Sequence, residues 1–138
     1  MRVVADTNVF ISAPMFGGLP GRFLELALGR RLLLVTSKAL LDELDEKLRG
    51  EFAVSERDAL AIRAKLEATA AVVDPEFGLN AVIEDPDDNR VPECAVAGRA
   101  DLIVSGDRHL LRIGCYEGIH LVTVRQFLEI NGFEEAEF

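Results

Sequence analysis

Short apolar runs alternate with segments of helical periodicity along nearly the whole chain, and this alternation constrains the fold more than any other feature. The clearest runs cover residues 2–6, 32–36, 101–104 and 119–122. Each run is too short to cross a bilayer. Strands separated by helical segments are typical of βα units with a parallel sheet. We therefore expect one α/β domain over residues 1–138, a three-layer α/β/α sandwich with a central, mainly parallel sheet and a frayed tail at 131–138.

Capping and breaker residues predict where the helices lie. Ser37 and Ser55 are expected N-caps, and Gly50 is expected to close the helix that carries Leu40, Leu41, Leu44 and Leu48 on one face. Pro92 places the start of another helix near Asp88 or Asn89, because proline costs little only in a first turn. Further helices are expected at 8–16, 22–29, 108–113 and 124–130, with a glycine- and proline-rich loop over 17–21.

Charge and cysteine content narrow the classes of function. A net charge of −9 argues against a broadly basic nucleic-acid surface, so an RNA-binding protein of this composition would need a local basic rim or a partner protein. Candidates for such a rim are Arg22, Arg99, Arg108, Arg112 and Arg125. The two cysteines, Cys94 and Cys115, lack metal-type spacing and are expected to be reduced. Arg2 and Asp6 interrupt the first ten residues where a signal peptide would be apolar, so we expect a cytoplasmic protein.

Carboxylates follow two of the expected strands. Asp6 and Asp107 stand just after apolar runs, and ligands of open α/β sheets bind outside the carboxyl ends of the strands. Asp88, at an expected helix start, can face the same edge. Glu43 and Asp45 lie on opposite margins of the leucine face of their helix, and periodicity does not choose between them.

Converging carboxylates repel one another unless a cation compensates their charge. All-oxygen ligands favour Mg²⁺ or Mn²⁺, which can activate a water molecule and stabilise charge during phosphodiester hydrolysis. Taken singly, each carboxylate has a simpler interpretation, as a turn residue, a solvated helix charge or part of an acidic loop. Their joint order along a βα pattern is what favours a metal site.

Four blocks of the sequence contain most of these carboxylates. They are Val4-Ala5-Asp6-Thr7-Asn8-Val9-Phe10-Ile11-Ser12, Thr36-Ser37 through Leu41-Asp42-Glu43-Leu44, Asp85-Pro86-Asp87-Asp88-Asn89, and Ala100-Asp101-Leu102-Ile103-Val104-Ser105-Gly106-Asp107 with Arg108-His109-Leu110-Leu111. In this order the blocks resemble the PIN-domain family, in particular the toxin components of bacterial and archaeal toxin–antitoxin systems, and the likeness extends to about Ile130.

The resemblance implies an Mg²⁺- or Mn²⁺-dependent endoribonuclease that acts on RNA, forms a homodimer and, for toxin members, is blocked by an antitoxin. It assigns Asp6, Glu43, Asp88 and Asp107 as the catalytic and metal-binding residues, and Asn8 and Ser105 as auxiliary polar residues. Ser105 replaces the more usual threonine and keeps the hydroxyl. His109 stands where the family often has an acidic residue; Arg108 and His109 are candidate substrate contacts, and Asp85 is a fallback ligand for Asp88.

Two other interpretations stay open at this point. An aspartate after the first strand also suggests a haloacid-dehalogenase-like phosphatase, but Asn8 stands where that mechanism needs a second aspartate. The alternative without catalysis is an inactive PIN scaffold that acts as a protein or RNA adaptor. That alternative predicts missing acidic positions, whereas all four are filled.

Overall fold

The computed structural model describes residues 1–16, 18–75 and 90–131, with side chains omitted for 12–20. A six-stranded sheet runs through the centre in the order β3-β2-β1-β4-β6-β5. Its strands are β1 (Arg2–Ala5), β2 (Leu33–Ser37), β3 (Ala71–Val73), β4 (Leu102–Val104), β5 (Cys115–Tyr116) and β6 (Ile119–Val122). All neighbouring pairs are parallel except β5 with β6. The expected mainly parallel sheet is thus confirmed. The edge strand β5 was not predicted, because a strand of two residues is too short to produce a recognisable sequence pattern.

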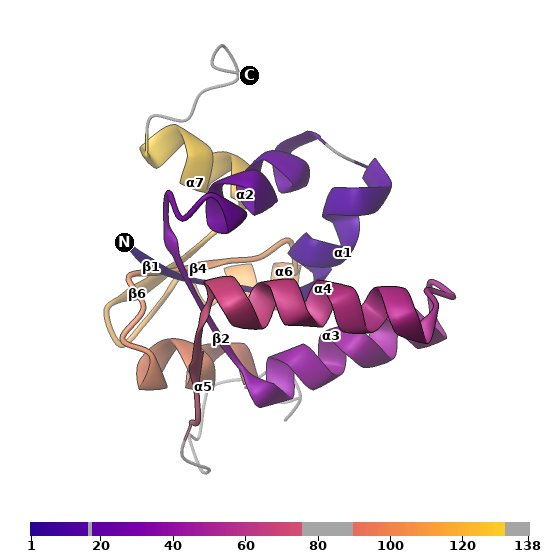
Figure 1. The fold of residues 1–138 in the computed structure, drawn as a ribbon. Coiled ribbons are helices and arrows are strands. Elements are labelled where there is room, and N and C mark those ends of the chain that lie inside the picture. The colour runs from indigo at the N-terminus through magenta and orange to yellow at the C-terminus, as the bar shows by residue number, and fades with distance from the viewer. Residues whose placement is uncertain (17, 76–89, 132–138) are drawn as a thin grey trace.

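Seven helices are described, and they lie on both sides of this sheet (Figure 1). They are α1 (Thr7–Phe16), α2 (Gly18–Leu28), α3 (Lys38–Gly50), α4 (Glu56–Thr69), α5 (Arg90–Ala97), α6 (Arg108–Leu111) and α7 (Val124–Ile130). Within β1, Val3 and Ala5 pack in one apolar cluster with α1, α2, α4 and α7, whereas Val4 packs in a second cluster with α5. This alternation buries both faces of the sheet and confirms the three-layer α/β/α sandwich.

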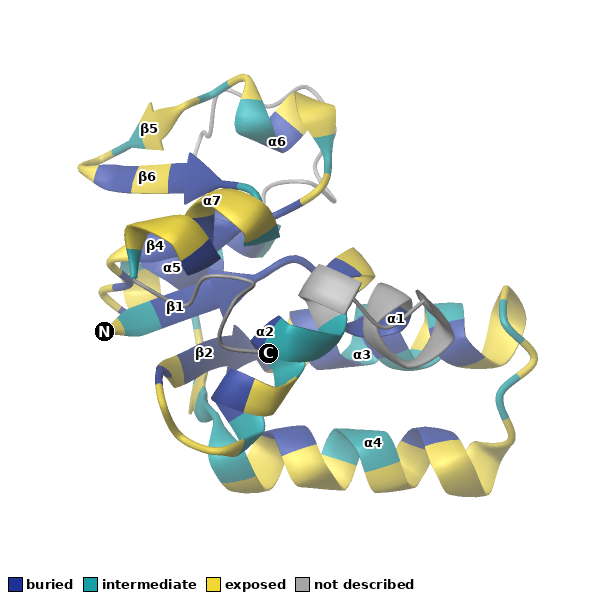
Figure 2. Cartoon of the chain, turned by 90° about the horizontal axis from the view of Figure 1, so that it is seen from above, coloured by how far each residue is buried: buried dark blue, intermediate teal, exposed yellow. Residues whose placement is uncertain are grey.

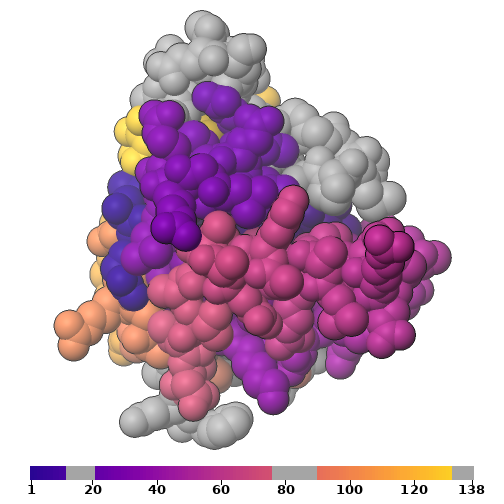
Figure 3. Space-filling view, in the orientation of Figure 1, coloured from indigo at the N-terminus to yellow at the C-terminus, as the bar shows by residue number. Residues whose placement is uncertain are grey.

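Burial follows the layers (Figure 2). The central strands are buried, and α4 exposes its outer side to solvent. Figure 3 shows that α2 and α4 lie next to each other on the face of the molecule presented there. An apolar cavity of about 180 Å³ lies among α1, α2, α3 and α4. None of the described helices is long and apolar enough to span a membrane.

Both expected N-caps are present, and α3 ends at Gly50 with Glu51 as its C-cap. The Ser37 hydroxyl accepts a hydrogen bond from the Leu40 backbone N–H at 3.2 Å, and Ser55 does the same for Asp58 at 3.1 Å. Leu40, Leu41, Leu44 and Leu48 are all buried, as their spacing predicted. Pro92 lies in the first turn of α5, where its missing N–H has no helical partner to lose.

One expected loop proved wrong. Residues 18–21 form the first turn of α2 instead of a glycine-rich connection, so the helix begins four residues earlier than Arg22. Pro20 is compatible with this, because a first turn needs no backbone donor. The helix expected over 108–113 is also shorter, since Arg112 is the C-cap of α6. Asp85, Asp88 and the tail at 132–138 lie outside the described residues.

Candidate active site

The strand order places two loops side by side at the carboxyl edge of the sheet. From β1 the chain first proceeds to β2 on one side and returns later to β4 on the other, which creates a topological switch point between β1 and β4. Ligands of open α/β sheets bind at such a point. Asp6 follows β1 there, and Ser105 and Asp107 follow β4.

Backbone hydrogen bonds fix both loops to the sheet. The Asp6 N–H donates to the Val104 carbonyl at 2.9 Å, and the Ser105 N–H donates to the Val122 carbonyl at 3.0 Å. Each bond extends a parallel ladder by one residue. Asp6 and Ser105 therefore have positions as fixed as those of the strands before them.

Ser105 joins the two aspartates. Its hydroxyl donates to Asp6 Oδ2 at 3.0 Å and accepts from the Asp107 backbone N–H at 2.9 Å. Ser105 is fully buried and Asp6 is nearly so, whereas Asp107 is half-buried. Asp107 also caps α6, because its Oδ1 accepts from the His109 N–H at 2.8 Å. The auxiliary position assigned to Ser105 thus contacts both aspartates directly.

Thr7 joins Asp6 to Glu43. Its hydroxyl oxygen lies 3.5 Å from Asp6 Oδ1 and 3.5 Å from Glu43 Oε2, and its single proton can be donated to either carboxylate. Both carboxylates therefore lie next to the same hydroxyl. Asp45, the other candidate on α3, pairs instead with Arg49 one turn along the helix, at 3.1 and 3.2 Å. Of the two acidic residues that periodicity left open, the structure brings Glu43 to Asp6.

One cation at this edge is Lys47, which lies one helical turn after Glu43. Its ammonium lies 3.7 Å from Glu43 Oε1 and 3.4 Å from Asn8 Oδ1. Sequence reasoning did not single out Thr7 or Lys47. The signal for Lys47 was its spacing of four from Glu43, which places both on one helix face. Thr7 gave a weaker signal, because a threonine after Asp6 is an ordinary helix-start residue.

The remaining sequence candidates are distributed as follows. Arg108 and His109 are exposed on α6, directly after Asp107. Arg99 lies before β4 and so belongs to the opposite, amino edge of the sheet, which removes it from a rim around Asp6. Asp88, the fourth acidic position, lies outside the described residues.

The donor atoms suit a hard divalent cation. No three His, Cys, Asp or Glu side chains of the described part are gathered around one point. The carboxylates of Asp6 and Glu43 both lie against the Thr7 hydroxyl, whereas the Ser105 hydroxyl links the Asp6 carboxylate to the backbone of Asp107. Mg²⁺ keeps several of its water ligands and is usually bound through one or two carboxylates instead of a closed protein cage. A pair of carboxylates with neighbouring hydroxyls therefore fits this class of ion.

Comparison with known proteins agrees with the fold and identifies the family. The chain is 33% identical over 119 residues to the uncharacterized protein MJ1680 of Methanocaldococcus jannaschii, covering 82% of this chain and 75% of the relative. Its fold is similar to VapBC2 from Rickettsia felis bound to a DNA fragment from their promoter, with a TM-score of 0.58, 16% identity and coverage of 89% of this chain and 98% of that one. It is also similar to PAE2754 from Pyrobaculum aerophilum, with a TM-score of 0.59, 15% identity and coverage of 96% and 90%. The family model for the PIN domain matches residues 2–109, and the chain therefore belongs to the PIN-domain family.

Proposed function

We propose that this protein is an endoribonuclease that depends on Mg²⁺ or Mn²⁺ and hydrolyses RNA phosphodiester bonds. PIN domains are generally nucleases and typically use divalent metal ions. The observation that carries the proposal for this chain is the hydroxyl-linked series Glu43, Thr7, Asp6, Ser105 and Asp107 at the switch point of the sheet.

The metal ligands in this proposal are Asp6, Glu43 and Asp107, with Asp88 as the fourth acidic residue. When bound, the divalent ion supplies a water molecule of lowered pKa and positive charge for the phosphate oxygens. Asp6 is the central ligand because it contacts both hydroxyl bridges. No protein nucleophile is needed for this reaction.

The neighbouring residues orient these ligands. The Ser105 hydroxyl donates to one oxygen of Asp6 and accepts from the backbone N–H of Asp107, and Thr7 lies against the other oxygen of Asp6 and against Glu43. Such hydrogen bonds to ligands fix side-chain rotamers and tune affinity for the ion. Asn8 is held near Glu43 through Lys47. Arg108 and His109 are the proposed contacts for RNA phosphates next to the cleaved bond.

The biological role that we propose is that of the toxin in a toxin–antitoxin pair, acting as a cytoplasmic homodimer that an antitoxin protein inhibits. The similarity of fold to VapBC2 supports this role, and so does the resemblance of the four acidic blocks. An acidic chain that acts on RNA would also gain from a partner that contributes basic surface.

The test is cleavage of a panel of RNAs with Mg²⁺, with Mn²⁺ and with EDTA. We expect the parent protein to cut only with a divalent ion, and Asp6→Asn and Asp107→Asn to lose at least about 100-fold in rate. That loss equals roughly 3 kcal/mol of transition-state stabilisation. Cleavage in EDTA, or parental rates in both variants, would contradict the proposal and favour the adaptor.

A further inference from the structure

Lys47 places a positive charge beside the carboxylate site. It lies on α3 one turn after Glu43, and its side chain is 27% exposed. The ammonium contacts Glu43 Oε1 at 3.7 Å and the Asn8 side-chain oxygen at 3.4 Å, so it links α3 to α1. Both contacts are long for hydrogen bonds to an ammonium, which indicates a loosely held cation instead of a tight structural ion pair.

The two oxygens of Glu43 face different neighbours. Oε2 lies against Thr7 and through it near Asp6, whereas Oε1 faces Lys47. Two carboxylates at this separation repel each other, and the ammonium offsets part of that repulsion. A divalent cation at Glu43 would compete with Lys47 for the same negative charge, because the two cations repel each other.

We propose that Lys47 is the resident counter-ion of Glu43 and that its ammonium binds an RNA phosphate once a divalent cation has taken over this carboxylate. The inference rests on the proposed function. Lysine suits such an exchange, since its charge sits on a flexible four-carbon stem with three donors. A cation beside the site also favours phosphate binding by a chain whose net charge is −9.

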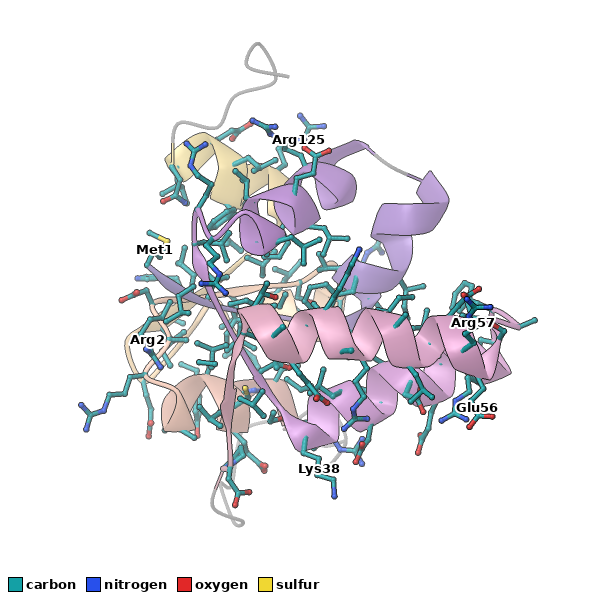
Figure 4. All side chains as sticks on the ribbon, in the orientation of Figure 1. Met1, Arg2, Lys38, Glu56, Arg57 and Arg125 are labelled. Carbon is teal, nitrogen blue, oxygen red and sulfur yellow. The ribbon has the colours of Figure 1, made fainter. Side chains whose placement is uncertain are left out.

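Lys38 provides a matched control for Lys47. It lies on the same helix, is exposed and points into solvent away from the sheet (Figure 4). Nine positions separate it from Lys47, which is about two and a half helical turns, so the two lysines lie on opposite faces of α3. Lys38→Met and Lys47→Met therefore remove the same charge from the same helix.

The first measurement is calorimetric titration with Mn²⁺ alone, without RNA. Loss of a competing cation predicts that Lys47→Met binds Mn²⁺ at least about threefold more tightly than the parent, whereas Lys38→Met matches the parent. Thermal melting of all three proteins checks that each is folded. Equal or weaker Mn²⁺ binding by Lys47→Met would overturn the inference.

The second measurement is binding of a fluorescent single-stranded RNA at 4 °C, once with Ca²⁺ and once with EDTA, with a gel to show that the RNA is intact. Lys47→Met should bind RNA several-fold more weakly than the parent with Ca²⁺ and equally well in EDTA, where Lys47 is engaged by Glu43. A loss of the same size in both buffers, or in neither, would overturn the inference.

These outcomes are separable from those of the proposed function. If the parent protein cleaves RNA with Mn²⁺ and Lys47→Met binds Mn²⁺ and RNA as the parent does, the role of Lys47 is rejected and the proposed nuclease activity is retained. A parent protein that neither binds Mn²⁺ nor cleaves RNA rejects both.

Discussion

The Ser105 hydroxyl donates to Asp6 Oδ2 at 3.0 Å, although the two residues are 99 positions apart in the sequence. The contact exists because β1 and β4 are parallel neighbours whose ladder pairs Ala5 with Val104. The residues that follow this pair then meet at the same edge of the sheet. The buried carboxylate of Asp6 thereby gains a fixed rotamer.

Ser105→Ala should remove the hydrogen bond that fixes the rotamer of the Asp6 carboxylate. The change leaves Asp6 Oδ2 without its buried donor and the Asp107 N–H without its acceptor, so we expect a loss of about 2 kcal/mol in unfolding free energy. Mn²⁺ affinity should fall about tenfold. Chemical denaturation and Mn²⁺ titration measure the two effects. Ser105→Thr keeps the hydroxyl and should retain most of the affinity; an equal loss in both variants would contradict a role for the hydroxyl.

Thr7→Val tests the second bridge. Valine has nearly the shape of threonine, so the buried packing of Thr7 is preserved while the hydroxyl between Asp6 and Glu43 is lost. We expect Mn²⁺ affinity to fall about tenfold with little change in melting temperature. Thr7→Ser, which keeps the hydroxyl and loses a methyl group, should show the opposite pattern. Parental Mn²⁺ affinity in Thr7→Val would show that the bridge is unimportant.

Gly98 tests the packing of α5 against the sheet. A Cβ added at this residue would lie 2.4 Å from Val35 Cγ1 and 3.1 Å from the Cys94 carbonyl oxygen. Gly98→Ala should therefore destabilise the protein by about 2 kcal/mol through overpacking. Gly50→Ala is the control, because a Cβ there meets nothing within 4 Å and should be neutral or slightly stabilising. Denaturant titration of both variants distinguishes steric crowding from a general effect of alanine.

Much of this architecture was predictable from local pattern. The leucine face of α3, its Ser37 cap and the strands β1, β2, β4 and β6 follow from apolar spacing and from caps within a few residues. The first turn of α2 was missed because Gly18 and Pro20 disfavour a helix locally, whereas packing of Phe23, Leu26 and Ala27 in the core stabilises it. Propensity is a weak guide where tertiary contacts are strong.

The residues of the candidate site also fall into those that the sequence could predict and those that it could not. Asp6 and Asp107 were identifiable because strand ends meet at one edge of a parallel sheet, and this needs only the order of elements. The choice of Glu43 over Asp45 depends on how α3 is rotated against α1. Helical periodicity places these two residues at opposite margins of one face, so it cannot predict which margin turns toward Asp6. The roles of Thr7 and Lys47 are visible only in the structure, because both depend on contacts between α1 and α3. Neither residue lies at a strand end, where the sequence pattern would have drawn attention to it.

The two cysteines should differ in reactivity. Burial raises the pKa of the Cys94 thiol to about 12 from its ordinary 9.0, against a smaller lowering by its hydrogen bond with Ser37, and Cys115 is exposed. A thiol reagent at pH 8 should therefore label Cys115 in the native protein, and Cys94 only after denaturation. Rapid native labelling of both would contradict the burial of Cys94.

The same pKa predicts a dependence of stability on pH. Unfolded Cys94 loses its proton near pH 9, whereas the folded thiol keeps it until about pH 12, so rising pH favours the unfolded state within this window. The contribution approaches about 1 kcal/mol per pH unit. This contribution is measured by comparing the unfolding free energies of the parent and Cys94→Ala from pH 8 to pH 10.5. The unfolding free energy of the parent should fall more steeply with pH, and parallel curves would contradict the raised pKa of Cys94.

The central claim is that the Asp6 carboxylate holds a divalent cation together with its neighbours, and Mn²⁺ titration without RNA tests it most directly. Asp45→Asn is the matched control, since it removes one negative charge from an ion pair with Arg49 on the same helix, α3. We predict that the parent and Asp45→Asn bind Mn²⁺ with similar affinity and that Asp6→Asn binds at least about tenfold more weakly. Parental affinity in Asp6→Asn would contradict the claim.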